Sequence, residues 1–348
     1  MVFAHLFTPK ELFLKNGNRY CREIAHGIFS ITLPLPGDKP GPVNVYLFVG
    51  KNNVTLLDTG TARAFGALKR AVADLGLALA DIDRIVLTHS HVDHYGSAAK
   101  IARESGELLD IAANFRNPVS IATGIGVSRK TMADFLALMG VPPAMRNIMR
   151  VLSVVFSALG DTCEVTTILR EGDIVPMGDY DCMVVETPGH TRDSICLYHE
   201  PTGMLFSGDH VLPHITPNAF VMLEDGEVLP MRMSQKEFYS SIDKVRSLSP
   251  RIIYPAHGRV IEDFEAVVRM YEESYRQRDE LIISILENNK SQTVYAIAGR
   301  LFPKLNMARL PLEIFLAVSE VYTHLQLLKE RGAVETEISG GTLLVKAC

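Results

Sequence analysis

The chain has 348 residues, of which 47% are hydrophobic and 22% charged, a composition typical of a globular protein and not of a disordered or collagen-like chain. At roughly 100–200 residues per domain, this length favours two domains over one. The 35 Lys and Arg residues against 40 Asp and Glu residues give a net charge of −5, so no overall basic field attracts nucleic acid.

The lack of a recognisable signal peptide or membrane span, together with the cysteine content, predicts a soluble, cytoplasmic protein. Residues 1–20 lack the basic start, long apolar stretch and small-residue cleavage site of a signal peptide. No apolar run approaches the ~18–20 residues that a membrane-spanning helix needs. The five cysteines contain no Cys-x-x-Cys pair, which is typical of reduced and mostly buried thiols.

Short runs rich in Val, Ile, Leu, Tyr and Thr, separated by Pro, Gly and Asn, predict strands early in the chain. These strands are expected over 26–36, 43–50, 52–60 and 81–90. Apolar residues at helical spacing predict a helix over 61–79, and a second helix is expected over 97–106. Hairpins followed by alternating strands and helices favour an α/β fold in which helices cover sheets.

A change of pattern between about 116 and 160 predicts a helical insertion. Four of the 13 methionines lie in it, and Pro142–Pro143 interrupts its helical stretches. The insertion is a candidate cap over an apolar substrate pocket, because flexible thioether side chains adapt to irregular ligands. Packing in the core or in a dimer is the alternative. Its basic residues would either hold an anionic group or form a solvated face: Arg129, Lys130, Arg146 and Arg150.

Strand signals return after the insertion. Strands are expected over 164–175, 181–189, 194–200, 203–209 and 251–258, with a charged helix over 234–248. A long helix that begins near Glu262 then leads to a boundary near 287–290. We therefore expect one domain over residues 1–287 and a smaller one over residues 288–348.

The smaller domain is predicted to have a winged-helix-like shape. Helices are expected over 293–301 and 312–331, and Gly340–Gly341 between two β-prone runs indicates a terminal hairpin. Residues 290–348 carry seven basic and five acidic side chains, a weak electrostatic footprint for a phosphate backbone. A role in packing or in a homodimer is expected here, without nucleic acid or a membrane as partner.

The segment Thr88–Gly96 places three histidines and an aspartate within six residues, directly after a predicted strand. These residues are His89, His91, Asp93 and His94. Imidazoles and a carboxylate packed this closely suit borderline divalent ions such as zinc. Four further polar residues follow predicted strands in the same way: Asp58, His190, Asp209 and His257. Loops that carry ligands to one edge of a sheet are a common way to build a metal site.

This ordered set resembles the five metal-binding motifs of the metallo-β-lactamase superfamily, over about residues 43–258. The resemblance implies an αββα sandwich. The complete His-x-His-x-Asp-His motif, with a later His, Asp and His, is most similar to the glyoxalase II-like hydrolase branch. His91 stands where flavo-diiron members usually carry glutamate, and no flavodoxin-like domain follows.

The resemblance also implies how the side chains divide between two divalent ions. One ion would be bound by His89, His91 and His190, and the other by Asp93, His94 and His257. Asp209 would bridge the two ions, with a water or hydroxide between them. Asp58 resembles a carboxylate that orients a ligand, and Asp93 could also orient the nucleophile or accept its proton. Zinc is the expected ion, with iron or manganese as alternatives.

Two ions that share a water lower its pKa from ~15.7 towards neutrality and so supply a hydroxide nucleophile. The resemblance, together with the apolar candidate cap, therefore implies a dinuclear metal hydrolase that uses this metal-bridging hydroxide on a small thioester or other activated acyl compound. A true β-lactamase is less expected. Two alternatives stay open: an endoribonuclease or phosphodiesterase of the same fold, and a mononuclear iron enzyme similar to persulfide dioxygenases. One of His210 and His214 would contact the substrate or donate a proton to its leaving group, or else both are loop histidines with local hydrogen bonds.

Overall fold

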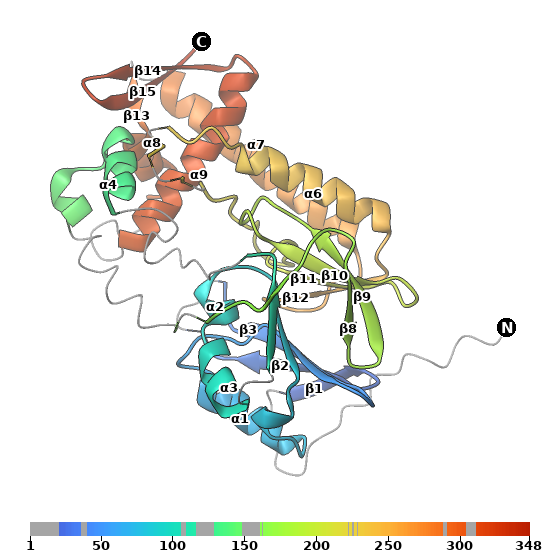
Figure 1. Cartoon of the computed structure of the whole chain (residues 1–348). Coiled ribbons are helices and arrows are strands. Elements are labelled where there is room, and N and C mark those ends of the chain that lie inside the picture. The colour runs from blue at the N-terminus through green and yellow to red at the C-terminus, as the bar shows by residue number, and fades with distance from the viewer. Residues whose placement is uncertain are drawn as a thin grey trace.

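The computed structural model of the chain contains two sheets packed face to face, with helices on both outer faces and a helical unit at one end (Figure 1). The structure describes residues 21–35, 40–105, 109–115, 129–147, 161, 163–221, 223–224, 226–227, 229–287, 291–303 and 311–348. Every structural statement below concerns these ranges. The layers are those of the predicted αββα sandwich.

The first sheet contains seven strands of the described chain, in sequence order. They are β1 (Cys21–Ala25), β2 (Ile28–Leu33), β3 (Val43–Val49), β4 (Val54–Leu57), β5 (Arg84–Leu87), β6 (Asp110–Ala113) and β7 (Thr167–Ile168). Strands β1 to β4 pair antiparallel and β4 to β7 pair parallel. Helices α1 (Phe65–Asp74) and α3 (Ala98–Ser105) and the short helix η1 (Leu79–Asp81) cover its outer face through an apolar cluster.

The second sheet has the order β12-β11-β10-β9-β8 within the described residues. Its strands are β8 (Ile174–Met177), β9 (Tyr180–Glu186), β10 (Ile195–His199), β11 (Met204–Gly208) and β12 (Ile252–Pro255). Helices α6 (Ser234–Leu248) and α7 (Phe264–Glu287) cover its outer face. Aromatic rings fill the space between the sheets, where Phe206 lies 5.1 Å from Tyr46 and 5.0 Å from Phe48 between ring centroids.

The C-terminal unit consists of α8 (Val294–Leu301), α9 (Pro311–Glu330) and a sheet of β13 (Gln292–Thr293), β15 (Thr342–Ala347) and β14 (Val334–Ser339). Helix α4 (Arg129–Leu138), from the insertion, packs into the same apolar cluster (Figure 1). Helix α7 contributes to two cores, because Tyr271 packs on the second sheet while Ile282 and Leu286 pack with α9. A separate winged-helix domain over 288–348 stays a prediction.

The structure departs from the sequence expectations at several strands. The run 164–175 forms two strands in different sheets, because a turn at Gly172, with φ of +82°, directs the chain from β7 to β8. The short strands β1 and β6 are absent from the sequence-based prediction. The described part of the insertion is helical, as predicted, whereas 116–128 and 148–160 lie outside the described residues.

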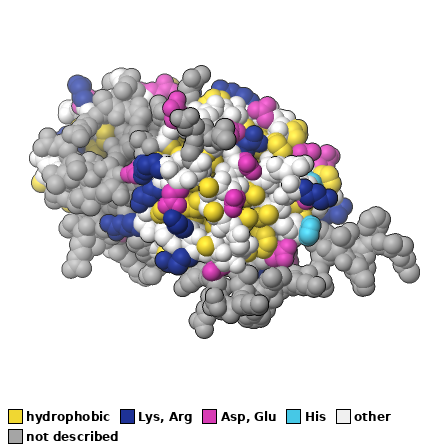
Figure 2. Space-filling model, turned by 60° about the horizontal axis from the view of Figure 1, so that its bottom comes forward, with side chains coloured by type: hydrophobic (Ala, Val, Ile, Leu, Met, Phe, Trp, Pro, Cys, Tyr) yellow, Lys and Arg dark blue, Asp and Glu magenta, His cyan; other side chains and the backbone are white. Residues whose placement is uncertain are grey.

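The surface and the thiols agree with the composition. Four cysteines are buried and Cys348 is exposed, which confirms the prediction of mostly buried thiols. On the face shown in Figure 2, basic and acidic side chains are interspersed, with hydrophobic side chains between them. Within the described residues no helix combines the length and the apolar character that crossing a bilayer requires.

Candidate metal centre

Seven of the predicted site residues meet at one edge of the sandwich, where strands from both sheets end. His89 follows β5, Asp209 follows β11 and His257 follows β12. Because β5 runs parallel to β4, and β11 to β12, the carboxyl ends of each pair lie at one edge of their own sheet, and the ligand distances bring these two edges together. His190 comes from the loop between β9 and β10, and the one-turn helix α2 (Val92–Tyr95) supplies Asp93 and His94.

Backbone hydrogen bonds between the sheets hold these loops together. The Asn44 N–H donates to the Ala256 carbonyl at 2.6 Å, beside His257, and the Ile195 N–H donates to the Thr88 carbonyl at 2.9 Å, beside His89. Gly208 has a φ of +52°, and a Cβ there would lie 2.9 Å from Thr88. Glycine at this position therefore lets the Asp209 loop approach the His89 loop closely.

The ligand-type atoms form two adjoining groups. His89, His91, His190 and Asp209 make one, and Asp93, His94 and His257 make the other, each with its atoms within 4.8 Å of one another. Asp209 connects the groups, because its Oδ1 lies 3.6 Å from His94 Nε2 and 3.5 Å from His257 Nε2. Its Oδ2 lies 3.6 Å from His190 Nε2.

Asp58 lies beneath the second group and holds two elements of the site. Its Oδ2 accepts from His94 Nδ1 at 2.8 Å and from the Thr88 hydroxyl at 2.8 Å, and its Oδ1 accepts from the Thr88 N–H at 2.8 Å. The Thr88 oxygen in turn lies 3.1 Å from His89 Nδ1. Asp58 itself has φ of +60°, so the backbone is strained where it delivers this carboxylate.

Two other histidines are oriented by backbone carbonyls. His190 Nδ1 donates to the Asn218 carbonyl at 2.9 Å, and His257 Nδ1 donates to the Pro42 carbonyl at 3.0 Å. An imidazole that donates through Nδ1 keeps the lone pair of Nε2 for a metal ion. Asn218 and Thr88 were not found from the sequence, because their contributions to the site are a main-chain carbonyl and a hydroxyl that follow no residue motif.

The residues present fit a metal ion. Buried atoms without a hydrogen-bond partner among the described residues include the Nε2 atoms of His89, His94 and His257 and the Oδ1 of Asp209. Buried polar atoms are normally paired, so this many unpaired polar atoms in one place need another partner. His91 Nδ1 and His190 Nε2 lie 3.1 Å apart, a separation at which two lone pairs need a shared proton or ion. Imidazole nitrogens and a carboxylate are suitable zinc donors.

Burial and mutual charge set the ionisation of the site. Burial lowers the pKa of His91 to about 3, and His190 beside it adds to the effect. Burial also disfavours a charged His94, but the surrounding carboxylates outweigh it and raise its pKa well above the ordinary value. Burial disfavours a charged Asp209, but the nearby His257 and His94 outweigh it and hold the pKa of its carboxyl well below its usual range. The carboxylates therefore stay ionised and available as ligands.

The two further histidines lie outside both ligand groups. His210 is buried, with its ring 5.1 Å from that of Phe238 on α6, and burial lowers its pKa to about 3. His214 is more exposed, and its Nε2 donates to the Pro40 carbonyl at 3.0 Å. Phe220, which the sequence analysis did not single out, has its ring 5.5 Å from His91 and 5.2 Å from His190.

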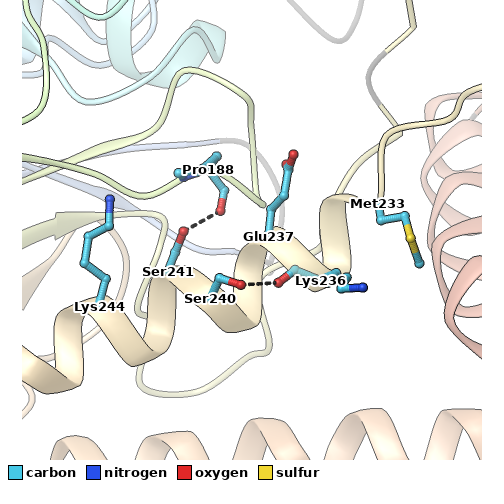
Figure 3. A pocket seen from close by; sticks show the side chains of 7 residues that line it. All are labelled: Pro188, Met233, Lys236, Glu237, Ser240, Ser241 and Lys244. Atoms are coloured by element: carbon cyan, nitrogen blue, oxygen red, sulfur yellow. Dashed lines mark hydrogen bonds between the residues drawn. The ribbon is translucent and has the colours of Figure 1, made fainter.

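A pocket of about 380 Å³ lies beside the loop that carries His190 (Figure 3). One wall is Pro188, whose carbonyl accepts from the Ser241 hydroxyl at 2.7 Å. Its two lysines are already paired, Lys236 with Glu330 and Lys244 with Glu171. The pocket therefore offers no unpaired lysine to an anion.

Comparison with known proteins identifies the family. The model of the metallo-beta-lactamase superfamily matches residues 38–113 and 138–257. The chain belongs to this superfamily. A solved metallo-beta-lactamase family protein, TTHA1429 from Thermus thermophilus, has the same fold, with a TM-score of 0.74 at 23% identity; the match covers 94% of this chain and 100% of that one.

Relatives of this metallo-beta-lactamase superfamily member include hydrolases. It is 29% identical over 324 residues to the "Probable metallo-hydrolase YqjP" of Bacillus subtilis (strain 168), covering 92% of this chain and 97% of that protein. It is 27% identical to the atrochrysone carboxyl ACP thioesterase of Aspergillus fumigatus, covering 72% and 64%. It is 28% identical to the acyl-coenzyme A thioesterase MBLAC2 of Bos taurus, covering 48% and 58%. The protein is therefore a metal-dependent hydrolase with the predicted fold.

Proposed function

We propose that the protein is a dinuclear zinc hydrolase of small acyl thioesters. The observation that carries the proposal is the pair of adjoining ligand groups with Asp209 between them. Two relatives are named as thioesterases, which supports the substrate class. The membership of the glyoxalase II-like branch and a cytoplasmic location stay predictions.

In this proposal each ion has its own set of histidines. The first ion is held by His89, His91 and His190, and the second by Asp93, His94 and His257. Asp209 reaches both sets, since one of its oxygens lies 3.6 Å from His190 Nε2 and the other 3.5 Å from His257 Nε2. A carboxylate between two cations offsets their repulsion, which is why one aspartate would serve both.

Two divalent ions, when bound, acidify a shared water and polarise the carbonyl oxygen of a substrate. Around them the chain supplies orientation and proton acceptance. Asp58 fixes the ring of His94 through the 2.8 Å bond to Nδ1. Asp93 is the most exposed of the site carboxylates, at 16%, and its Oδ2 lies 3.4 Å from His257 Nε2. That position suits a group that orients a nucleophile and accepts its proton.

The surroundings of the first ligand group favour an acyl substrate over RNA. Phe220 places an apolar ring beside His91 and His190, where it can contact an acyl chain. A phosphodiester substrate calls for basic side chains around the site. Arg192, two residues from His190, instead pairs with Glu224 at 2.7 Å. The second ligand group also favours two ions over the single iron of a persulfide dioxygenase-like enzyme.

A substrate screen tests this proposal. The zinc-loaded protein is assayed on acyl thioesters, lactones, phosphodiesters and β-lactams, with Asp209→Ala as the inactive control. We expect thioesters to give the highest kcat/KM and the control to lose that activity. Turnover of a phosphodiester above that of every thioester would contradict the acyl assignment and favour the nuclease alternative.

A further inference from the structure

The segment 217–221 lies between the metal centre and the C-terminal unit. On one side the Asn218 carbonyl accepts from His190 Nδ1 at 2.9 Å, and the Phe220 ring packs against His190 and His91. On the other side Phe220 and Val221 belong to the apolar cluster built by α4, α8 and α9. The segment thus supports the histidines of one ligand group and is also part of the apolar core of the C-terminal unit.

Helix α9 holds this segment through two side chains. The Asn218 Nδ2 donates to Glu320 Oε2 at 3.1 Å, and the Val221 N–H donates to the Ser319 hydroxyl at 2.7 Å. Helix α7 adds a third bond, from the Tyr275 hydroxyl to the Pro217 carbonyl at 3.0 Å. The carbonyl that orients His190 is therefore fixed from residues about 100 positions later in the chain.

Glu320 is itself fixed. Its Oε1 forms an ion pair with Arg278 Nε of α7 at 2.5 Å, with side-chain exposures of 14% for Glu320 and 26% for Arg278. Arg278 also donates to the Ser274 hydroxyl at 2.9 Å. The ion pair joins the Glu320 carboxylate of α9 to α7, so the acceptor of the Asn218 bond is held between two helices.

We propose that Glu320, with Arg278, is a positioning residue for the ligand His190 and acts through Asn218. The proposal rests on the metal centre proposed above. Groups that orient a ligating histidine set its tautomer and its ring direction, and changes in them weaken metal binding. The C-terminal unit would then serve the metal centre directly and would not be only a stabilising attachment.

The test separates positioning from stability. Asn218→Ala keeps the main-chain carbonyl but removes its anchor. A double variant, Arg278→Met with Glu320→Met, removes the ion pair without leaving one charge buried alone. A matched control replaces another Arg–Glu pair, Arg232 just before α6 and Glu237 on α6, whose described side-chain bonds do not reach segment 217–221. Zinc affinity is measured by chelator competition, and folding by thermal unfolding.

We expect Asn218→Ala and the Arg278/Glu320 double variant each to weaken zinc binding about tenfold, the lower end for outer-layer changes. The triple variant that combines Asn218→Ala with the double variant should bind zinc no more weakly than Asn218→Ala or the double variant alone, because both changes break the same connection. The double variant should still unfold cooperatively, and the control pair should leave zinc affinity unchanged. Additive losses, or a loss equal to that of the control, would overturn the proposal.

A readout on the metal-free protein keeps this test distinct from the proposed function. Hydrogen exchange of the amides in 217–221 should be faster in Asn218→Ala and in the double variant than in the wild type, and unchanged in the control. Unchanged exchange would overturn the positioning role. A wild-type protein that binds no zinc would instead overturn the proposed function, whatever the exchange shows.

Discussion

Two buried histidines in this molecule have the same immediate partner and different surroundings. His94, at the metal centre, has its Nδ1 2.8 Å from an oxygen of Asp58. His324, on α9 of the C-terminal unit, has its Nδ1 2.6 Å from an oxygen of Asp279. Both imidazoles are fully buried, and the Nε2 of each lacks a hydrogen-bond partner among the described residues.

The two histidines differ in the groups that surround their rings. His94 Nε2 faces the carboxylates of Asp209 and Asp93, at 3.6 and 3.8 Å. The ring of Tyr275 lies 5.4 Å from that of His324 between centroids, and Arg331 pairs with the second oxygen of Asp279 at 3.0 Å. A buried His–Asp pair alone therefore does not indicate a metal site. The convergence of several strand ends does.

Replacing Asp209, the carboxylate between the two ligand groups, should have the largest effect of the changes that test the contrast between the metal centre and the His324–Asp279 pair. We expect Asp209→Ala to lower kcat on a thioester by at least about a thousandfold and to reduce metal content, because two cations would repel without a shared anion. Steady-state kinetics and elemental analysis measure both. The exposed Asp173→Ala serves as control, and retention of two ions with near-normal turnover in Asp209→Ala would contradict the bridging role.

Replacing each of the two compared histidines with alanine should distinguish a metal ligand from a structural residue. His94→Ala should lower zinc content by about one ion per chain, because it removes a ligand of the second group. His324→Ala should leave zinc content unchanged and lower the free energy of unfolding by about 1–3 kcal/mol, through loss of a buried hydrogen-bonded partner. Elemental analysis and denaturant unfolding provide the measurements. Equal zinc loss in both variants would remove the distinction.

How much of this centre could be predicted from the sequence follows from the kind of group involved. His89, His91 and Asp93 stand close together in the chain, and His and Asp after β-prone runs indicate ligands, so the converging side chains could be chosen without a structure. The Asn218 carbonyl could not, because every residue has one and only the fold shows which carbonyl faces His190. Its anchor, Glu320, is remote in the chain for the same reason.

The fold shows a similar division. Strands with long apolar runs, such as β3 and β10, were predicted because burial on both faces leaves a clear composition. The short strands β6 and β7 are held by neighbouring strands more than by their own composition, and the turn near Gly172 sends β7 and β8 to different sheets. Which sheet a strand joins depends on contacts far away in the sequence.

Acidification should affect the metal-free protein through the histidines that burial keeps neutral. The pKa of His91 is about 3 in the folded state, below the ordinary value of 6.5, so the unfolded chain binds its proton first as pH falls. Stability from this residue is therefore complete above pH ~6.5 and is lost progressively between about 6.5 and 3. The free energy of unfolding should fall less steeply with decreasing pH in His91→Ala than in the wild type, by up to about 1.4 kcal/mol per pH unit. Identical slopes in the two proteins would contradict this.

The smallest effect concerns the thiols, which lie away from both compared histidines. Burial raises the pKa of Cys182 and of Cys196 to about 12, and of Cys21 and Cys163 to about 11. We expect one fast-reacting thiol per folded chain, Cys348, with a disulfide reagent at pH 8, and five after unfolding. Cys348→Ser should abolish the fast phase. A second fast thiol in that variant would show that one of the three apolar clusters that bury the other cysteines is open.

Anomalous scattering at the zinc absorption edge, from crystals of the zinc-loaded protein, tests the central claim most directly. We expect two peaks, one among His89, His91 and His190 and the other among Asp93, His94 and His257, with Asp209 contacting both. We expect no peak at His324. A single peak, or zinc bound outside these two groups, would contradict a dinuclear centre built at the ends of the strands.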